Sequence, residues 1–372
     1  AIGSPVPAPW PSPAWRLVER LTGMAAGVTV RAAHPHGQYG TVEVELELDH
    51  LPTTAGDPMP APLRLLLDVA SARGETYPVP GDNPVVHFGA LEDDLARRDL
   101  TINAMAMELA SGTLLDPHGG QDDLAHRQLR FLHPDSLRED PTRLVRAARY
   151  AARLGFALAP SSQSQTSRTL AAWPWTWRIG DPPGEAPAAL ATRLRMELEL
   201  LLEREPWPRA LACLQQWGGL ALLDPALQAD GRWHRRLRWA ERLGLPKMAA
   251  LVAVAPDPLA LAERLQLPHR QHRLLEGLQD LRRRLALAGD GDSPAAWTAR
   301  LEQPGLPVEA VALALAAGLG PRRPLLRWWL RWRHLGAGTT ASELMAAGLP
   351  PGPALGQRLR WLRLQRIDAE RP

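Results

Sequence analysis

Residues 138–156 read REDPTRLVRAARYAARLGF and contain the clearest helix signals of the chain. Asp140 stands directly before Pro141, a pair typical of an N-cap and a first helical residue, because the carboxylate accepts from unpaired N–H groups and proline lacks one. Gly155 is a typical residue for the C-terminal end, where a left-handed conformation closes the last turn. The pattern therefore predicts one helix of about four turns between these residues.

Arginine side chains line one face of this predicted helix, and apolar side chains line the opposite one. The arginines recur at spacings of three, three and four, which places them on a single stripe. A solvated helix face normally mixes acids and bases at i and i+4, yet no acid stands among these arginines after the first turn. We therefore expect an anionic partner; the alternative is pairing with acids from the N-terminal part of the chain. The stripe consists of Arg143, Arg146, Arg149 and Arg153, and the buried face of Leu144, Val145, Ala148, Ala151 and Leu154.

Charge is distributed unevenly along the chain. Residues 1–124 carry 7 arginines against 17 acidic residues, a net charge of −10, whereas the remaining residues carry 36 basic against 23 acidic ones, a net charge of +13. An excess of basic residues is typical of a surface that meets a polyanion, so we expect the C-terminal part to bind one. The only lysine, Lys247, has a context that fits neither a phosphate-binding loop, nor a protein-kinase strand, nor a lysine nucleophile.

Length and composition indicate a globular protein. The 372 residues predict about two to three compact units, and no run of about 18 uncharged apolar residues is present to cross a bilayer. Cys213 is the only cysteine, so no internal disulfide can form, and the N-terminal residues lack the basic and apolar regions of a secretory signal. We therefore expect a cytoplasmic protein.

Hydrophobic alternation predicts strands only in the N-terminal part. Residues 39–49 alternate valine or leucine with glutamate, which is typical of a half-buried strand. Residues 63–70 are apolar with little alternation, so we expect an interior strand there, and a third, short strand at 112–116. From residue 122 onward we expect amphipathic helices and no further strands. The expected fold is α+β, and the joints between groups of helices are expected near 174–187, 290–294 and 318–324.

Polar residues that suit nucleotide binding precede the arginine helix. Arg97 and Arg98 are adjacent and cannot share a helix face, so one of them can turn to a phosphate. Asp99 and Asn103 stand four residues apart and could together grip a ribose hydroxyl; a plain helix cap is the alternative for Asp99. Residues 116–123, DPHGGQDD, are interpreted as a glycine-containing turn that permits motion, or as an ordinary turn.

Five short motifs occur in a defined order: QYGTVEV at 38–44, DVASARGETY at 68–77, RRDLTINA at 97–104, LDPHGG at 115–120 and EDPTR at 139–143. Together they resemble the bacterial class II tRNA nucleotidyltransferase and poly(A) polymerase family. Two later segments, RLRMEL at 193–198 and LMAAGLPPGPALG at 344–356, are similar to that family's neck-to-body helix and tail turn. The resemblance covers the chain from about residue 39 to the C-terminus.

The resemblance implies a nucleotidyltransferase-type head with a mixed sheet, truncated at its first strands, followed by an all-helical neck, body and tail. In that family the head joins CTP or ATP to the 3′ hydroxyl of a tRNA that the four parts clasp. We expect a head at 1–120, a nucleotide-recognising neck at 121–185, a body at 186–295 and a tRNA-binding tail at 296–372.

The resemblance also implies roles for single residues. Arg98 and Asp99 would contact the ribose of the incoming nucleotide. Asp140 and Arg143 would bind the base edge, where a carboxylate suits an exocyclic amine and a guanidinium suits a ring nitrogen and carbonyl. Arg146 would bind the triphosphate. The expected nucleotide-binding set is Arg97, Arg98, Asp99, Asn103, Asp140, Arg143, Arg146 and Arg149.

The implied activity is addition of CCA, or of its terminal A, to tRNA 3′ ends, and poly(A) addition is the alternative within the same family. Residues 75–90 are similar to the family's mobile loop, which argues against addition of CC alone. The implied partners are tRNA, CTP and ATP. Neither a membrane nor a protein partner is expected.

A magnesium site is implied by the resemblance, since the family holds two divalent ions on an Asp-x-Asp strand. Residues 5–11, PVPAPWP, contain no carboxylate, and the only Asp-x-Asp, Asp290 and Asp292, is interpreted as a turn. Asp68 is therefore the expected catalytic residue and metal ligand. Two hypotheses remain: an enzyme whose first residues precede this sequence, which we favour, and a degenerate RNA-binding paralogue without a metal site.

Histidine and tryptophan residues receive mainly structural interpretations. His118 and His133 show no ligand spacing, so no zinc is expected. The tryptophans are expected to fill helix interfaces in a chain poor in Phe and Tyr. Trp328 or Trp332, which lie between arginines, are the only candidates for an RNA contact. The tryptophans concerned are Trp173, Trp175, Trp177, Trp328, Trp329 and Trp332.

Overall fold

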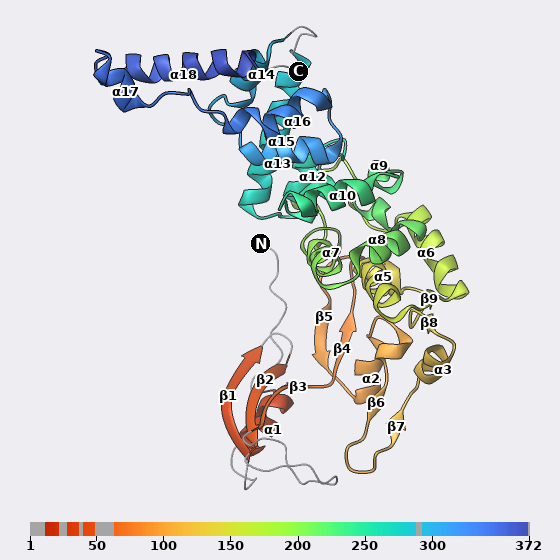
Figure 1. Cartoon of the computed structure of the whole chain (residues 1–372). Coiled ribbons are helices and arrows are strands. Elements are labelled where there is room, and N and C mark those ends of the chain that lie inside the picture. The colour runs from red at the N-terminus through yellow and green to blue at the C-terminus, as the bar shows by residue number, and fades with distance from the viewer. Residues whose placement is uncertain (1–11, 22–27, 37–39, 49–62, 288–291, 371–372) are drawn as a thin grey trace. The chain divides into compact units, whose positions relative to one another are not determined.

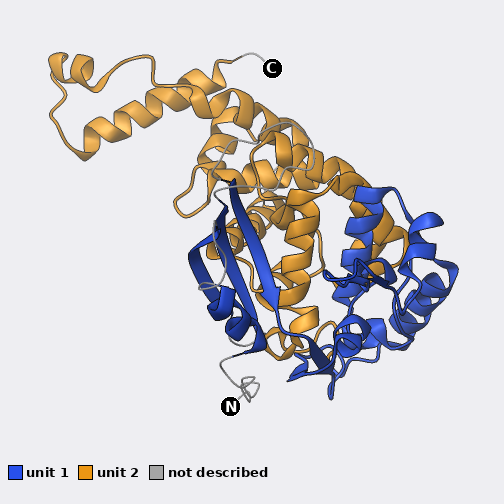
Figure 2. Ribbon diagram, turned by 90° about the horizontal axis from the view of Figure 1, so that it is seen from below, with its two compact units in different colours: residues 1–176 blue, residues 177–372 orange. Residues whose placement is uncertain are grey.

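The computed structural model describes residues 12–21, 28–36, 40–48, 63–287 and 292–370. The chain divides into two compact units, residues 1–176 and 177–372 (Figures 1 and 2). Within the described residues, all named strands lie in the first unit, and helices build the second. This arrangement confirms the α+β class. The expected head, neck, body and tail divide the chain more finely than these two units and stay a prediction.

The first unit contains strands and helices, of which α5 and α6 are the longest helices at 13 residues each, and α5 is central to the site described below. Its elements are α1 (Pro13–Leu21), β1 (Val28–His36), β2 (Thr41–Leu48), β3 (Leu63–Ala70), β4 (Arg73–Thr76), β5 (Val85–Phe88), α2 (Leu91–Ala96), η1 (Thr101–Asn103), β6 (Ala106–Met107), β7 (Leu114–Leu115), α3 (Gly120–Ala125), β8 (Gln128–Leu129), α4 (Ser136–Glu139), α5 (Thr142–Leu154), β9 (Ala157–Leu158) and α6 (Pro160–Ala172).

An antiparallel sheet in the order β1–β2–β3 forms the N-terminal part of this unit (Figure 1). The alternation predicted at 39–49 is confirmed: Val42, Val44 and Leu46 of β2 point to one face and pack against Ala14 and Val18 of α1. Burial of such side chains contributes about 1.5–3 kcal/mol each. The glutamates between them lie on the other face, which α1 does not cover.

Strand β3 differs from its prediction as an interior strand. It pairs with β2, and within the described residues it lies at the edge of the sheet. Leu66 is 66% exposed, and Leu67 and Asp68 are exposed as well. An apolar strand is buried on both faces only when neighbouring elements cover both of them. The sequence pattern of the strand does not show whether such elements are present.

Several short strands were missed or mispredicted. The segment resembling a mobile loop, residues 75–90, contains most of an antiparallel hairpin, β4–β5. The strand predicted at 112–116 is confirmed as β7, which pairs with β6. The prediction that strands end there is wrong, because β8 and β9 form a parallel pair of two residues each. Strands of two to four residues are too short to leave a readable alternation.

Helix α5 has the predicted ends, and four residues of its predicted buried face are buried, but the fifth, Leu154, is 42% exposed. It begins at Thr142, whose N–H and hydroxyl both donate to Oδ1 of Asp140 at 2.9 and 2.6 Å. It ends at Gly155, which has a left-handed φ of 78°. The capping carboxylate and the glycine therefore fix both ends of the helix that carries the arginine stripe.

The second unit is an assembly of helices around an apolar interior that includes nearly all of α15. The joints predicted at 174–187 and 318–324 are confirmed, since no α-helix crosses either segment. No helix in the described residues is long and apolar enough to cross a membrane. The elements are η2 (Pro183–Glu185), η3 (Ala188–Leu190), α7 (Thr192–Arg204), α8 (Trp207–Gln216), η4 (Gly219–Leu222), α9 (Pro225–Gln228), α10 (Trp233–Arg242), α11 (Lys247–Val252), α12 (Pro258–Arg264), α13 (His269–Ala286), α14 (Pro294–Leu301), α15 (Val308–Ala317), α16 (Arg322–Leu330), η5 (Trp332–His334), α17 (Ala341–Ala346) and α18 (Pro353–Asp368).

Tryptophan packing in this unit confirms the structural interpretation and corrects the exception to it. Trp328 is 1% exposed and donates from Nε1 to Glu302 at 3.0 Å, and Trp332 is also buried. Neither side chain is therefore available to stack on RNA. Trp361 of α18, which received no role from the sequence, is 49% exposed and lies against the guanidinium of Arg358 at 4.3 Å.

The C-terminal end of α5 provides a test of the fold. Gly155→Ala places a Cβ on a residue whose φ is 78°, and we expect it to destabilise the protein by about 1 kcal/mol. Thermal unfolding followed by circular dichroism measures this effect. Gly184→Ala is the control, because an added Cβ there meets nothing within 4 Å and no positive φ is needed, so its effect should stay within about 0.5 kcal/mol. Equal melting temperatures for wild type and Gly155→Ala would contradict the left-handed end of α5.

Candidate functional site

A cavity of about 280 Å³ lies in the first unit, with walls from the β4–β5 hairpin, α2 and the segment from His133 into α5. Its volume is close to the lower end of the range for small-molecule sites, about 300–1,000 Å³. Acidic, basic and aromatic side chains alternate in its wall, which suits a ligand with both donors and acceptors. The lining residues are Gly74, Glu75, Thr76, Tyr77, His87, Asp93, Ala96, Arg97, His133, Glu139 and Arg143.

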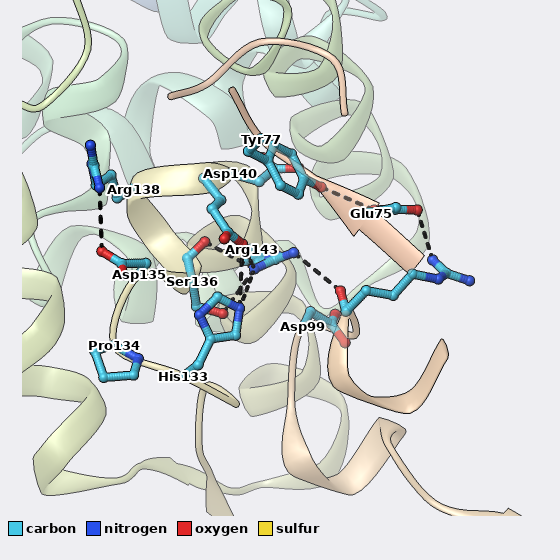
Figure 3. A network of polar contacts seen from close by, with 12 residues as sticks. Glu75, Tyr77, Asp99, His133, Pro134, Asp135, Ser136, Arg138, Asp140 and Arg143 are labelled. Carbon is cyan, nitrogen blue, oxygen red and sulfur yellow. Dashed lines mark hydrogen bonds and ion pairs between the residues drawn. The ribbon is translucent and has the colours of Figure 1, made fainter. Parts of the chain in front are cut away.

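Arg143 is the most deeply buried charged group of this wall, with 4% of the residue exposed (Figure 3). Its Nη1 donates to the carbonyl and hydroxyl oxygens of Ser136 at 3.1 and 2.9 Å, and to Glu139 at 3.2 Å. Its Nη2 donates to the carbonyl oxygen of Arg97 at 3.1 Å. The ring of Tyr77 lies 5.7 Å from the guanidinium. These contacts hold the planar group in one orientation and leave Nε–H and one Nη2 hydrogen for another acceptor.

Asp140 lies directly before Pro141 at the start of α5 and contacts Thr142. Its side chain is half-buried, and Oδ1 caps the start of α5 through Thr142. It lies next to Arg143 in Figure 3 but does not belong to the cavity lining. The structure therefore places Arg143 in the cavity wall, whereas Asp140 caps the start of α5.

Glu139 contributes the carboxylate that meets Arg143. Its Oε2 also lies 3.3 Å from Nε2 of His133. Burial alone would raise the pKa of Glu139, but the hydrogen bonds and charges of His133 and Arg143 outweigh it and hold that pKa below its ordinary value. The spacing of four between Glu139 and Arg143 is a sequence signal that could have identified this pair.

Arg97 and Arg98 converge on one carboxylate instead of separating. Arg97 donates from Nη2 to Asp94 at 2.7 Å and from Nη1 to Glu75 at 3.0 Å, and Arg98 donates to Asp94 at 2.6 Å. Helix α2 ends at Ala96, so both arginines lie beyond the helix. The argument that adjacent residues cannot share a helix face therefore does not apply to them. Burial alone would raise the pKa of Asp94, but its hydrogen bonds to Arg98 and Arg97 lower it. The spacings of three and four from Asp94 were the missed signal.

Asp99 and Asn103 contact each other, and Asp99 meets the arginine stripe at Arg146. Asp99 is buried; its Oδ1 accepts from Leu100 N–H at 2.9 Å and from Asn103 Nδ2 at 3.0 Å, and its Oδ2 accepts from Arg146 Nε at 2.6 Å. Burial alone would raise the pKa of Asp99, but the charge of Arg146 and these hydrogen bonds hold it below its ordinary value. The alternative for the stripe, pairing with acids from earlier in the chain, is therefore confirmed at Arg146.

The rest of the stripe becomes progressively more exposed toward the end of α5. Arg149 is half-buried and does not line the cavity, and Arg153 is exposed with its guanidinium 5.5 Å from the ring of Tyr150. The four arginines thus share a helix face but not one environment.

Sequence comparison identifies the family. Residues 42–130 match the family described as the poly A polymerase head domain. A CC-adding tRNA nucleotidyltransferase from Deinococcus radiodurans is 37% identical over 311 residues, which are 79% of this chain and 67% of that protein. The chain belongs to the class II tRNA nucleotidyltransferase family.

Other members of the family match over shorter stretches. A multifunctional CCA protein from Leptothrix cholodnii is 43% identical over 167 residues, 43% of this chain and 36% of that protein. An A-adding tRNA nucleotidyltransferase from Aquifex aeolicus is 41% identical over 133 residues, 35% of this chain and 14% of that protein. The chain thus aligns with much less than two thirds of these two relatives.

Solved structures of tRNA nucleotidyltransferases share the fold. A CCA-adding enzyme without ligand has a TM-score of 0.63 and 21% identity, with 96% of this chain and 82% of that chain covered. The Thermotoga maritima CCA-adding enzyme complexed with tRNA has a TM-score of 0.61 and 20% identity, with 96% and 81% covered.

The metal site of a tRNA nucleotidyltransferase is not assembled by the described residues alone. Asp68 lies exposed on β3, opposite Glu43 of β2 in the antiparallel register. Among the described residues, no group of three or more His, Cys, Asp or Glu side chains is placed to hold a metal ion. Residues 5–11 and Asp290 lie outside the described residues. The sequence-based interpretations of these residues therefore stay predictions.

The ion pair of Asp99 and Arg146 predicts a pH dependence. Because the pKa of Asp99 is lowered in the folded protein, its stabilisation is present above about pH 4 and is lost as the pH falls through the lowered value. We expect Asp99→Asn to destabilise the protein by about 2 kcal/mol at neutral pH, and this difference should narrow between about pH 5 and pH 3.

Urea unfolding at a series of pH values measures the difference. Asp135→Asn is the matched control, because Asp135 and its partner Arg138 are both exposed, and such a pair contributes less than about 1 kcal/mol. A destabilisation by Asp99→Asn that stays constant across this pH range would contradict the charged contact.

Proposed function

We propose that this chain is a tRNA nucleotidyltransferase that adds CCA, or its terminal A, to tRNA 3′ ends from CTP and ATP in the cytoplasm. The observation that carries the proposal is the buried guanidinium of Arg143 in the wall of the cavity. Four protein acceptors fix its orientation, and its remaining N–H groups suit the acceptors on a base edge. The family membership supports the reaction class.

In this proposal, different residues around Arg143 contact the base and the ribose of the nucleotide. Arg143 contacts the base, and Asp140, two residues before the first residue of α5, contacts an exocyclic amine of the base. Arg98, whose side chain is 42% exposed, contacts the ribose together with Asp99. A carboxylate can accept about four hydrogen bonds, and three donors already bind the two oxygens of Asp99, so one position remains.

The phosphates meet the basic groups in this proposal. Arg146 keeps Nε on Asp99, and its side chain is 35% exposed, so its terminal nitrogens are the proposed contacts to the triphosphate. Arg97, Asn103 and Arg149 complete the proposed set, Asn103 by holding Asp99. Mg²⁺ with Asp68 as one ligand also belongs to the proposal, although no group of three or more possible metal ligands stands among the described residues.

The tRNA body is proposed to bind the second unit, which carries most of the positive charge. Helix α18 presents exposed Arg358 and Arg360 beside the half-exposed Trp361. Guanidinium groups bind phosphates, and an exposed indole can stack on a base or ribose. This surface replaces the sequence-based candidates Trp328 and Trp332.

Incorporation assays test the proposed function and its alternatives. A tRNA that lacks its last three nucleotides is incubated with CTP, with ATP, and with both; a second tRNA ends in CC and receives ATP. Three nucleotides with both substrates support CCA addition, and one adenosine on the CC-ending tRNA alone supports A addition. Two cytidines and no adenosine match the CC-adding relative, long adenosine tracts support poly(A) polymerase, and RNA binding without incorporation supports the degenerate paralogue.

Arg143 provides a test of the base contact. We expect Arg143→Ala to reduce the preference for CTP and ATP over UTP and GTP by about tenfold or more, with little effect on the Kd for tRNA. Arg143→Lys retains the charge but loses the planar fork, so it should show the same loss of nucleotide preference. It replaces Arg143→Ala in the test should the alanine variant fail to fold. The measurements are kcat/KM for each nucleotide and tRNA binding by filter retention.

Arg153→Ala serves as the control for these variants, because Arg153 is exposed on the same helix and does not line the cavity. It should retain the nucleotide preference of the wild type. Equal losses of nucleotide preference and tRNA affinity in Arg143→Ala would contradict the base contact.

The arginines of α18 provide a test of the RNA surface. The double replacement of Arg358 and Arg360 by Ala should weaken tRNA binding and reduce the slope of log K against log salt by about two, about one per phosphate contact. Titrations of labelled tRNA at several salt concentrations measure the slope. Gln365→Ala, an exposed uncharged position on the same helix, should leave the slope unchanged. An unaltered slope in the double variant would exclude α18 from the RNA surface.

A further inference from the structure

His133 lies beside the base-contacting guanidinium in the cavity wall, although its sequence position gave it no role. Its Nε2 is 3.3 Å from Oε2 of Glu139 and 3.5 Å from Nη1 of Arg143 (Figure 3). The side chain of His133 is 32% exposed, whereas that of Arg143 is 5% exposed. The imidazole therefore lies where the buried guanidinium meets the cavity.

The backbone around His133 is held in place by a neighbouring helix. Nε2 of Gln165, a buried residue of α6, donates to the carbonyl oxygens of His133 at 3.0 Å and Pro134 at 2.7 Å. The N–H of Ser136 donates to the same His133 carbonyl at 3.1 Å. Hydrogen bonds from α4 and α6 therefore hold the main chain that carries the imidazole.

One carboxylate oxygen serves two partners in this cluster. Oε2 of Glu139 contacts both His133 and Arg143. Because the two contacts share one oxygen atom, each contact weakens the other. A neutral imidazole has one donor and one acceptor nitrogen, whereas an imidazolium has two donors and a positive charge. Protonation of His133 therefore attracts Glu139 and repels the guanidinium 3.5 Å away.

We propose that His133 is a positioning residue that sets how Glu139 and Ser136 hold Arg143, and thereby which edge Arg143 turns toward the nucleobase. This inference rests on the proposed function, in which Arg143 contacts the base. His133 itself needs no contact with the nucleotide. It acts by changing the partners of the guanidinium, so its effect is on nucleotide selection and not on RNA binding.

Other titratable groups share the cavity and must be separated from His133 in any pH experiment. Beside Glu139 and Arg143, the charged or titratable lining residues are Glu75, Tyr77, His87, Asp93 and Arg97. His87 is a second imidazole in the same lining. A replacement at His133 is therefore required to assign a pH effect to it.

Two replacements distinguish positioning from a general structural role. His133→Ala removes the ring, and His133→Gln places an uncharged amide near the position of Nε2, so it restores a hydrogen-bonding partner that does not titrate. His126→Ala is the control, because His126 is exposed on the same unit and bonds only to the carbonyl of Asp122. Circular dichroism and thermal unfolding confirm that each variant is folded.

The readout is the preference for CTP and ATP over UTP and GTP between pH 5.5 and 8.5, measured as kcat/KM and, independently of turnover, as the Kd for each nucleotide. We expect about a tenfold loss of preference in His133→Ala, with tRNA affinity within about twofold, and recovery of most of it in His133→Gln. The wild-type preference should be lower at the acidic end of this range, because an imidazolium repels the guanidinium 3.5 Å away, and His133→Gln should abolish that difference.

The outcomes separate this inference from the proposed function. If wild type selects CTP and ATP but His133→Ala selects equally well at every pH, the positioning role is wrong and the proposed function stands. If wild type shows no preference in binding or turnover, both are wrong. A pH-dependent fall that persists in His133→Gln would assign the effect to another group of the cavity and would also overturn the positioning role.

Discussion

The buried guanidinium of Arg143 is the contact on which the first unit depends. It joins the carbonyl after α2, the start of α4 and its own helix α5, three segments that are separated by as many as 46 residues in the chain. A buried charge without partners would cost several kcal/mol, so each of these acceptors must lie in place for the unit to be stable. The same requirement positions the β4–β5 hairpin, whose Tyr77 covers the guanidinium, and so forms the cavity. Stability and the shape of the candidate site therefore arise from one set of contacts.

Carboxylates organise the other arginines of the site in the same way. Asp94 holds Arg97 and Arg98, Asp99 holds Arg146, and each of these two acids is buried and has a lowered pKa. A cluster of guanidiniums without such acids would repel itself in the absence of a nucleotide. The acids hold the arginines close together. In the proposed function, a triphosphate or base edge would compete with these internal acceptors, which would favour ligands whose acceptors match the geometry over those that offer charge alone.

Local signals account for the elements that the sequence predicted well. Asp140 and Gly155 delimit α5 because capping and left-handed termination depend on neighbouring residues only. The alternation in β2 was sufficient to assign its buried face. The predicted burial of β3 was wrong, since burial of an apolar strand depends on what covers it. The β4–β5 hairpin was missed because its strands have four residues each. Trp328 and Trp332 were only candidates for an RNA contact, and both are buried; arginine neighbours in sequence do not show which side of a helix faces the interior.

By itself, the sequence determined the family, the α+β class and the arginine helix, because motif order, helix caps and periodicity are properties of the chain. Of the predicted nucleotide-binding residues, Arg97 and Arg143 line the cavity. The tertiary structure alone decided the partners of those residues: that Arg143 is buried against Ser136 and Glu139, that Asp94 serves two arginines, and that His133 borders the cavity. Such pairings join segments far apart in sequence. Their geometry follows from packing, which no short stretch of residues encodes.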